Sequence, residues 1–169
     1  MPSRHICLRH AGLAAPEVVR WLTAAQRDGG FGDKPNLLGT YFALQVLAAL
    51  NGLNDAVATA ARRFVDAHQF KLFGFTITAD AAMSSLEVIH AGVRCCELLR
   101  LPVRYARDIV SFVRACQSVD GGMSRVPGAL PEIESTHYGV ALLLALESRG
   151  VAVRAVAADE SCNNPTRII

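Results

Sequence analysis

No run of lysine or arginine occurs in this chain of 169 residues, although its formal net charge is +2. Nucleic-acid-binding proteins gather such residues on one face, so the scattered arginines argue against a nucleic-acid partner. An apolar stretch of the length that a secretory signal or a membrane span requires is also missing. We therefore expect a soluble, cytoplasmic protein without a membrane span.

The cysteines lack the spacing of a disulfide or metal framework. There are five, an odd number, and no Cys-x-x-Cys pair occurs among them. Secreted disulfide scaffolds and zinc ribbons depend on such pairs, so we expect reduced thiols that lie mostly in the core. Charged residues are scarce at 19%, while hydrophobic residues reach 51%. This balance predicts a large core or an apolar surface that awaits a partner.

What the chain does contain is a repeat. An aromatic residue is followed five positions later by a glutamine and then by a loop that contains glycine, at Trp21 and Gln26, Phe64 and Gln69, and Phe112 and Gln117. After each loop a hydroxyl residue precedes an apolar run, at Thr40, Ser85 and Thr136. Serine and threonine are favoured at helix starts, and apolar spacings of three and four indicate helices on both sides of the loop. Each unit is therefore predicted to be a helical hairpin.

The repeat also predicts the organisation of the chain. We expect a single domain over residues 1–169, with repeats at about 16–53, 54–101 and 102–150. Segment 151–169 begins like another first helix but lacks the aromatic residue and the glutamine, so we predict that it caps the repeats. No useful stretch of alternating polar and apolar residues indicates a sheet. The predicted fold class is therefore all-α, built from helical hairpins.

The double glycines after the first helices invite comparison with a phosphate-binding loop. That interpretation fails because the glycines follow a helix, and neither a strand nor a Gly-Lys-Ser/Thr sequence is present. Glycine at the C-terminus of a helix tolerates the left-handed backbone that ends it. We assign the glycines, and the glutamine that precedes them, to the geometry of the hairpin.

The repeated motif resembles that of protein prenyltransferase β subunits and of squalene and terpene cyclases. The residues that carry the resemblance are Trp21, Gln26, Asp28, Gly29, Gly30, Phe31, Thr40 and Tyr41, and again Phe112, Gln117, Asp120, Gly121, Gly122, Thr136 and Tyr138. The resemblance implies an α/α toroid, in which inner helices surround an apolar cavity for isoprenoid chains. Closed rings of this family have about twice as many hairpins. We therefore expect a half-toroid that is completed as a homodimer or by a partner subunit.

The two chemistries of that family leave different marks. The resemblance would place a zinc-binding Asp-x-Cys at the entrance of an inner helix, but none of the three equivalent stretches, which end at Thr40, Ser85 and Thr136, contains cysteine. Protein prenylation is therefore disfavoured. Class II cyclases use Asp-x-Asp-Asp before a threonine, and the equivalent stretch here runs from Glu132 to Thr136, with Glu134 in the place of the proton donor. The alternative is that these acids cap the start of the helix.

The candidate site follows from these matches and from the pattern of the second helices. The candidate catalytic residues are Glu134, Glu132 and His137, and the candidate substrate-binding residues are Tyr41, Gln45, His90 and Tyr138. They form a site if their mixed stripe faces the lumen, and are otherwise ordinary, partly exposed helix residues. The neighbouring apolar stripe is predicted to pack hairpin on hairpin through Ala43, Leu44, Leu47, Val88, Ile89, Gly92, Gly139, Val140 and Leu143.

Two Glu-x-x-His pairs occur in this stripe, at Glu87 and His90 and at Glu134 and His137. Similar pairs bind two metal ions in four-helix bundles, together with further glutamates. Counted from the predicted helix starts, the two pairs occupy different positions along their helices. The sequence also offers no obvious candidates for the further glutamates. We therefore predict no metal site and no cofactor, apart from Mg²⁺ if the substrate is a diphosphate.

Two functions remain. The first is an isoprenoid-related enzyme, resembling terpene cyclases or prenyltransferases, that holds a prenyl chain in its lumen and protonates an alkene with a carboxylic acid. The second is a non-catalytic binding or assembly module of the same fold, which binds a hydrophobic ligand or a partner subunit. The missing cysteine and the incomplete acidic motif favour the second function, while the polar stripe favours the first.

Overall fold

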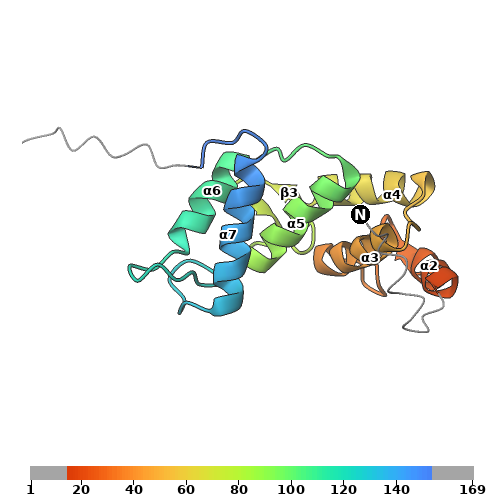
Figure 1. Ribbon diagram of the computed structural model, residues 1–169, viewed down its shortest axis with the longest axis horizontal. Helices are drawn as coiled ribbons and strands as arrows, with labels where there is room; N and C mark the ends of the chain where they lie inside the picture. Colours follow the sequence, from red (N-terminus) through yellow and green to blue (C-terminus); the bar gives the residue numbers. More distant parts are fainter. Residues whose placement is uncertain (1–14, 154–169) are drawn as a thin grey trace, which may run out of the picture.

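The computed structural model describes residues 15–153, which form six α-helices in three successive hairpins (Figure 1). The first helices of the hairpins are α2 (Ala15–Ala24), α4 (Asp55–Ala67) and α6 (Ala106–Ala115). The second helices are α3 (Leu37–Ala49), α5 (Leu86–Leu99) and α7 (Ile133–Glu147). Helix α5 packs between α3 and α7, and these three helices form an inner row. The predicted all-α class of helical hairpins is confirmed.

Parts of the predicted chain organisation lie outside the described residues. Of the predicted capping segment, only residues 151–153 are described, and Cys7 and Cys162 are not among the described positions. The other three cysteines, Cys95, Cys96 and Cys116, are free and buried, as the sequence predicted. No helix between residues 15 and 153 combines the length and the apolar character needed to cross a bilayer.

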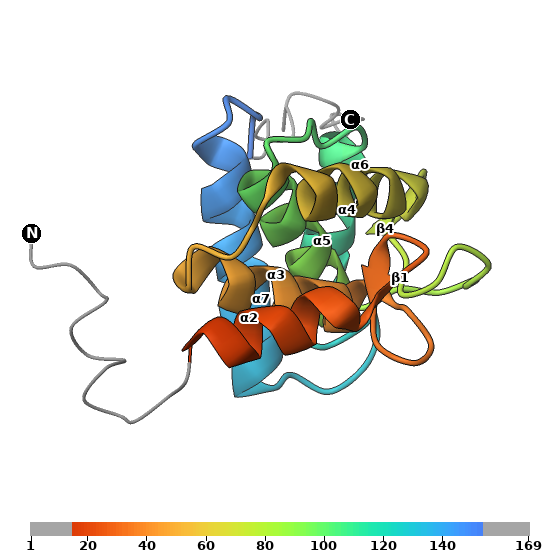
Figure 2. The same ribbon diagram turned by 90° about the vertical axis from the view of Figure 1, so that its right-hand side faces the viewer.

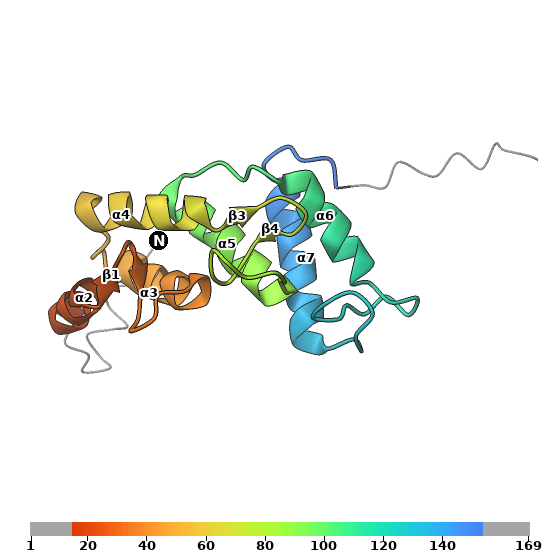
Figure 3. The ribbon, with the colours of Figure 1, turned by 180° about the vertical axis from the view of Figure 1, so that it is seen from behind.

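The loop inside each hairpin folds back on itself through very short antiparallel contacts. Strand β1 (Gln26–Arg27) pairs with β2 (Gly30–Phe31), and β3 (Gln69–Phe70) pairs with β4 (Gly74–Phe75). The loop of the third hairpin makes two isolated bridges, between Gln117 and Met123 and between Ser124 and Pro131. Both strand pairs lie on the side of the molecule that faces the viewer in Figure 3. Gly74 and Gly121 both adopt a φ of +89°, a left-handed conformation that glycine adopts without steric cost.

The second helices begin at Leu37, Leu86 and Ile133, so the predicted starts are wrong at two of the three hairpins. Ser85 does cap α5, and its Oγ accepts a hydrogen bond from the N–H of Val88. Thr40 and Thr136 instead lie one turn inside their helices, where each hydroxyl accepts a backbone N–H of the preceding loop. The sequence pattern misleads because a threonine hydroxyl accepts a backbone N–H equally well in either place.

The inner row forms the centre of the core. The ring of Phe75 is fully buried and lies against Gly92, where a Cβ atom would stand 2.2 Å from the ring. The predicted packing stripe is confirmed for its members on α3 and α5 and for Gly139, all of which are buried. Val140 and Leu143 depart from the prediction, since Val140 is 45% exposed and Leu143 is half-buried. They lie on α7, which has no following hairpin within residues 15–153.

The repeated glutamines join one hairpin to the next. Gln26 Nε2 donates to the carbonyl of Gly29 in its own loop and to that of Val57 in α4, both at 3.1 Å. Gln69 Nε2 donates to the carbonyl of Pro102, and its Oε1 accepts the N–H of Arg104 at 2.8 Å. The sequence predicted the contact within the loop. The structure adds that the same side chain positions the following hairpin.

Candidate functional site

The observed helix starts change the alignment of the three inner helices. Tyr41, His90 and His137 are each the fifth residue of their helix, in α3, α5 and α7. Glu87 and Glu134 are each the second residue. The expectation that the two Glu-x-x-His pairs stand at different heights is therefore wrong. It arose because Ser85 was aligned with Thr40 and Thr136, whereas the structural equivalent of those threonines is Ile89.

Because these residues occupy equivalent positions along their helices, the aromatic and imidazole rings of the inner row lie close together. The ring centre of His90 lies 5.9 Å from that of Tyr41, 6.3 Å from that of His137 and 5.1 Å from that of Tyr138. Gln45 donates a hydrogen bond to the hydroxyl of Tyr41. The five predicted residues Tyr41, Gln45, His90, His137 and Tyr138 thus form one continuous group, which we call the ring row.

His90 is the buried centre of the ring row. Its burial, with the positive charge of Arg94 and the neighbouring His137, lowers the pKa of His90 to about 4. Burial also raises the pKa of Tyr41, although Arg94 opposes this shift. Both groups are therefore neutral at pH 7 and present ring faces and hydrogen-bonding atoms without charge.

The candidate acids lie at the edge of the ring row. Glu132 and Glu134 are both exposed. Glu132 is the N-cap residue of α7, but its side chain makes no hydrogen bond to a backbone N–H of the helix and instead accepts one from Ser135 Oγ at 3.0 Å. Glu134 shares a small pocket with Glu87 and with Arg125, whose guanidinium lies 3.6 Å from the Glu87 carboxylate. An acid that stays protonated needs burial, and this chain alone does not bury Glu134.

The carboxylates and imidazoles of the inner row do not form a metal site. Among residues 15–153, no group of three or more His, Cys, Asp or Glu side chains is placed to hold a metal ion. Cys95 and Cys96 are buried in α5, and this burial raises the pKa of both thiols, that of Cys96 to about 12. Thiols in such a setting are poor metal ligands and poor nucleophiles.

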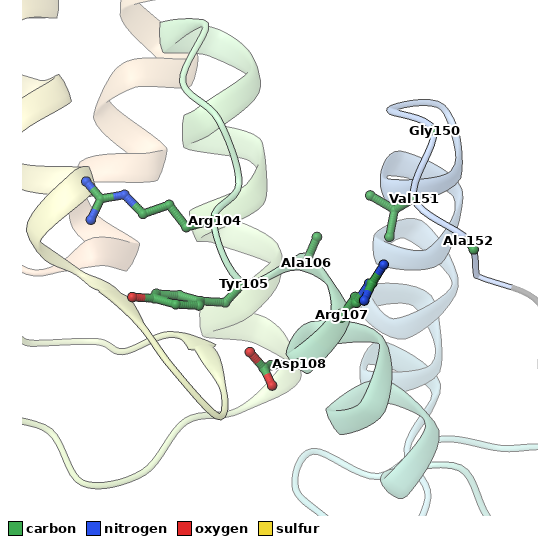
Figure 4. Close-up of a pocket in the computed structure, with 8 residues that line it drawn as sticks. All are labelled: Arg104, Tyr105, Ala106, Arg107, Asp108, Gly150, Val151 and Ala152. Carbon is green, nitrogen blue, oxygen red and sulfur yellow. The ribbon is translucent and has the colours of Figure 1, made fainter.

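A larger pocket lies away from the ring row. It measures about 540 Å³ and is formed by residues 104–108 at the start of α6 and residues 150–152 after α7 (Figure 4). Arg104 lies at its edge, but its guanidinium pairs with Asp66 and its N–H is bound by Gln69. The polar groups on that side hold hairpins together, so we assign this pocket to structure.

Arg94 was missed by the sequence analysis. It is the ninth residue of α5, the position that Gln45 occupies in α3, and it lies one turn beyond His90. Arg94 pairs with Glu97 on the same helix. Alignment of the helices on their first aliphatic residues, Leu37, Leu86 and Ile133, would have found it.

The hairpins, the inner row and the ring row define a class of protein, the helical-hairpin toroids. A family profile described as the prenyltransferase alpha-alpha toroid domain matches residues 8–165. Since this match covers most of the chain, the protein belongs to the prenyltransferase alpha-alpha toroid family, as the resemblance of its motifs implied. A comparison with curated proteins gives no significant match.

Proposed function

We propose that this protein binds an isoprenoid-type chain on the face of the inner row. The observation that carries the proposal is the ring row, in which four rings from three helices follow one another at 5.1 to 6.3 Å. Aromatic faces offer broad apolar contact, and they also attract positive charge such as that of a carbocation. Family membership supports the same class of ligand.

The polar end of the ligand is assigned to the ninth positions of the inner helices. Gln45 and Arg94 lie there, one turn beyond Tyr41 and His90. A guanidinium forms paired hydrogen bonds with phosphate oxygens, so Arg94 suits a diphosphate. The carboxylate of Glu97 pairs with Arg94, and no step of the proposal passes through Mg²⁺.

A second half of the ring forms part of the proposal. With three hairpins the ring row stays open on one side, and a homodimer or a partner subunit would enclose the ligand. The free thiols of Cys95, Cys96 and Cys116 suit a reducing compartment, and we propose that the protein acts in the cytoplasm.

Binding is tested with a prenyl diphosphate and a prenyl alcohol of the same chain length. Replacement of Tyr41 by leucine removes one ring of the row and the acceptor of the Gln45 hydrogen bond. We expect the affinity for both ligands to fall by up to about tenfold, the effect of one aromatic contact. Isothermal titration calorimetry measures this change. Tyr105→Leu, on the outer side at the start of α6, is the matched control and should bind as wild type. Equal affinities in the two variants would contradict the proposal.

Catalysis is the second candidate function, and one observation favours it. Glu134 lies one turn before His137 on the same face of α7, so an enclosed ligand on the ring row would meet its carboxyl. If Glu134 protonates an alkene, Glu134→Gln should lower turnover of a linear polyprene by about a hundredfold. Product analysis by mass spectrometry measures it, with Glu147→Gln at the other end of α7 as control. Turnover that survives Glu134→Gln would exclude this role, and no turnover by wild type would leave binding as the function.

A further inference from the structure

Inside the row of hairpins, each first helix packs on the loop of the hairpin before it. Phe64 of α4 packs on the first loop, where a Cβ atom at Gly30 would stand 2.6 Å from its ring. Phe112 of α6 packs on the second loop, and its ring centre lies 6.0 Å from that of Phe73. One aromatic position thus packs on the preceding loop at both junctions, although Gly74, the equivalent of Gly30, lies against Ile109.

The first hairpin offers the same aromatic residue to solvent. Trp21 occupies the position of Phe64 and Phe112, five residues before the glutamine, yet it is 69% exposed. Figure 2 looks onto this end of the molecule, with α2 in front. No loop precedes Trp21 within the described residues, so the helix that carries it lacks the contact that α4 and α6 have.

The third hairpin has a loop on which no first helix packs among the described residues. In its loop, residues 118–122, Val119 is fully exposed, and a Cβ atom at Gly121 would meet nothing within 4 Å. Gln117 bonds to the carbonyl of Gly121 in its own loop, but residues 15–153 give it no neighbour that corresponds to the ones Gln26 and Gln69 bind. The last loop is therefore shaped to receive a first helix.

A second repeated contact shows the same complementarity. The N–H of Leu37, at the start of α3, donates to the carbonyl of Ile77, and that of Leu86 donates to Arg125, both at 3.0 Å. Ile133 begins α7 without such a carbonyl among the described backbone groups and is 91% exposed. Ile77 and Arg125 each lie two residues after the last paired residue of the loop in their hairpin. The residue at the same position in the first hairpin is Asp33, which is exposed.

We propose that two copies of this chain assemble head to tail into a ring. Trp21 of each copy packs on loop 118–122 of the other, and the Asp33 carbonyl accepts the N–H of Ile133. Within residues 15–153, no first helix follows α7 to make the contact of Phe64 and Phe112. The axes of α3, α5 and α7 turn in one sense along the row (Figure 1), and a head-to-tail contact forms a ring when the rotation between copies closes.

The proposal rests on the packing of the hairpins and does not depend on the ligand proposed above. The assembly of two copies would nevertheless enclose the open side of the ring row. In the ring, α7 gains a following hairpin, and Val140, Glu134 and His137 come to lie at a junction between copies. The assembly thus provides the burial that a carboxylic acid at Glu134 needs.

Light scattering during gel filtration tests the assembly on the full chain. We expect the mass of two 18.1-kDa chains at micromolar concentration. Trp21→Glu and Val119→Glu should each raise the dissociation constant at least about thirtyfold, because each variant places a charge in the same central contact of the interface. Both side chains are exposed in the single chain, so circular dichroism should show unchanged helix content. Met83→Glu is the matched control, since Met83 is 70% exposed but lies away from both ends, and should stay dimeric.

Fluorescence distinguishes head-to-tail pairing from other dimers, because Trp21 is the single tryptophan. The emission maximum of Trp21 should lie at a shorter wavelength in the wild-type dimer and should shift to a longer wavelength in Val119→Glu. Mixing Val119→Glu with Trp21→Glu should restore the emission at the shorter wavelength, since the first chain keeps Trp21 and the second keeps an intact loop.

A monomeric wild type, a dimer that survives either substitution, or an open series of larger species would each overturn the proposal. The two proposals fail separately. Prenyl-ligand binding by a monomer would refute the ring, and with it the enclosure of the ligand by a second copy, but not ligand binding itself; a dimer that binds no prenyl ligand would refute the function alone.

Discussion

Replacement of Gly74 by alanine is expected to destabilise the fold by about 3–5 kcal/mol, from two independent effects. The φ of Gly74 is +89°, a conformation that strains any residue with a Cβ atom. That Cβ atom would also stand 2.1 Å from Cγ1 of Ile109, a fully buried side chain of α6 that has no room to move. Gly74 is therefore required at the junction between the second and third hairpins.

Gly128→Ala separates the two effects. Gly128 has a φ of +82°, close to that of Gly74, but a Cβ atom there would meet nothing within 4 Å. The control should lose only the backbone term, about 1–2 kcal/mol. Urea unfolding followed by circular dichroism measures both variants. Equal losses at Gly74 and Gly128 would show that close packing at the junction contributes nothing.

Replacement of Phe75 by alanine is expected to lower the free energy of unfolding by about 3–5 kcal/mol, the range for a buried phenylalanine. Its ring is fully buried against Gly92 at the middle of α5. Removal leaves a cavity beneath the helix that carries His90, and Gly92 has no side chain to fill it. We therefore expect looser packing of the ring row as well as lower stability.

The neighbouring Phe70 is the control for Phe75. It is 42% exposed, and Phe70→Ala should change the stability by less than about 1 kcal/mol. Phe75→Leu should lie between wild type and Phe75→Ala, since leucine fills part of the same space. A loss below about 1 kcal/mol for Phe75→Ala would mean that the core collapses around the vacant space, and that Phe75 does not hold α5 in place.

The hairpins could be predicted from the sequence because their signals are local. The aromatic residue, the glutamine and the glycines recur at short fixed spacings, and each acts within one loop or one helix turn. The reduced, buried cysteines were expected because the chain lacks the cysteine spacing of a disulfide or metal framework. The periodicity of the second helices and the repeated motif also led to five residues that the structure brings into one group, although their role stays a prediction.

The alignment of the hairpins depends on contacts between distant parts of the chain, which the sequence pattern does not reveal. Thr40 and Ser85 look alike in sequence, yet Thr40 bonds to a loop inside the fold and Ser85 caps a helix. That difference moves α5 by one turn relative to the sequence alignment and brings His90 level with Tyr41 and His137.

The open ends of the row depend on tertiary packing in the same way. Trp21 matches Phe64 and Phe112 in sequence, and its exposure follows only from the absence of a preceding loop within residues 15–153. A repeat in sequence predicts contacts inside each unit, because these depend on nearby residues. Contacts between units depend on which neighbour is present, and that is a property of the assembled structure.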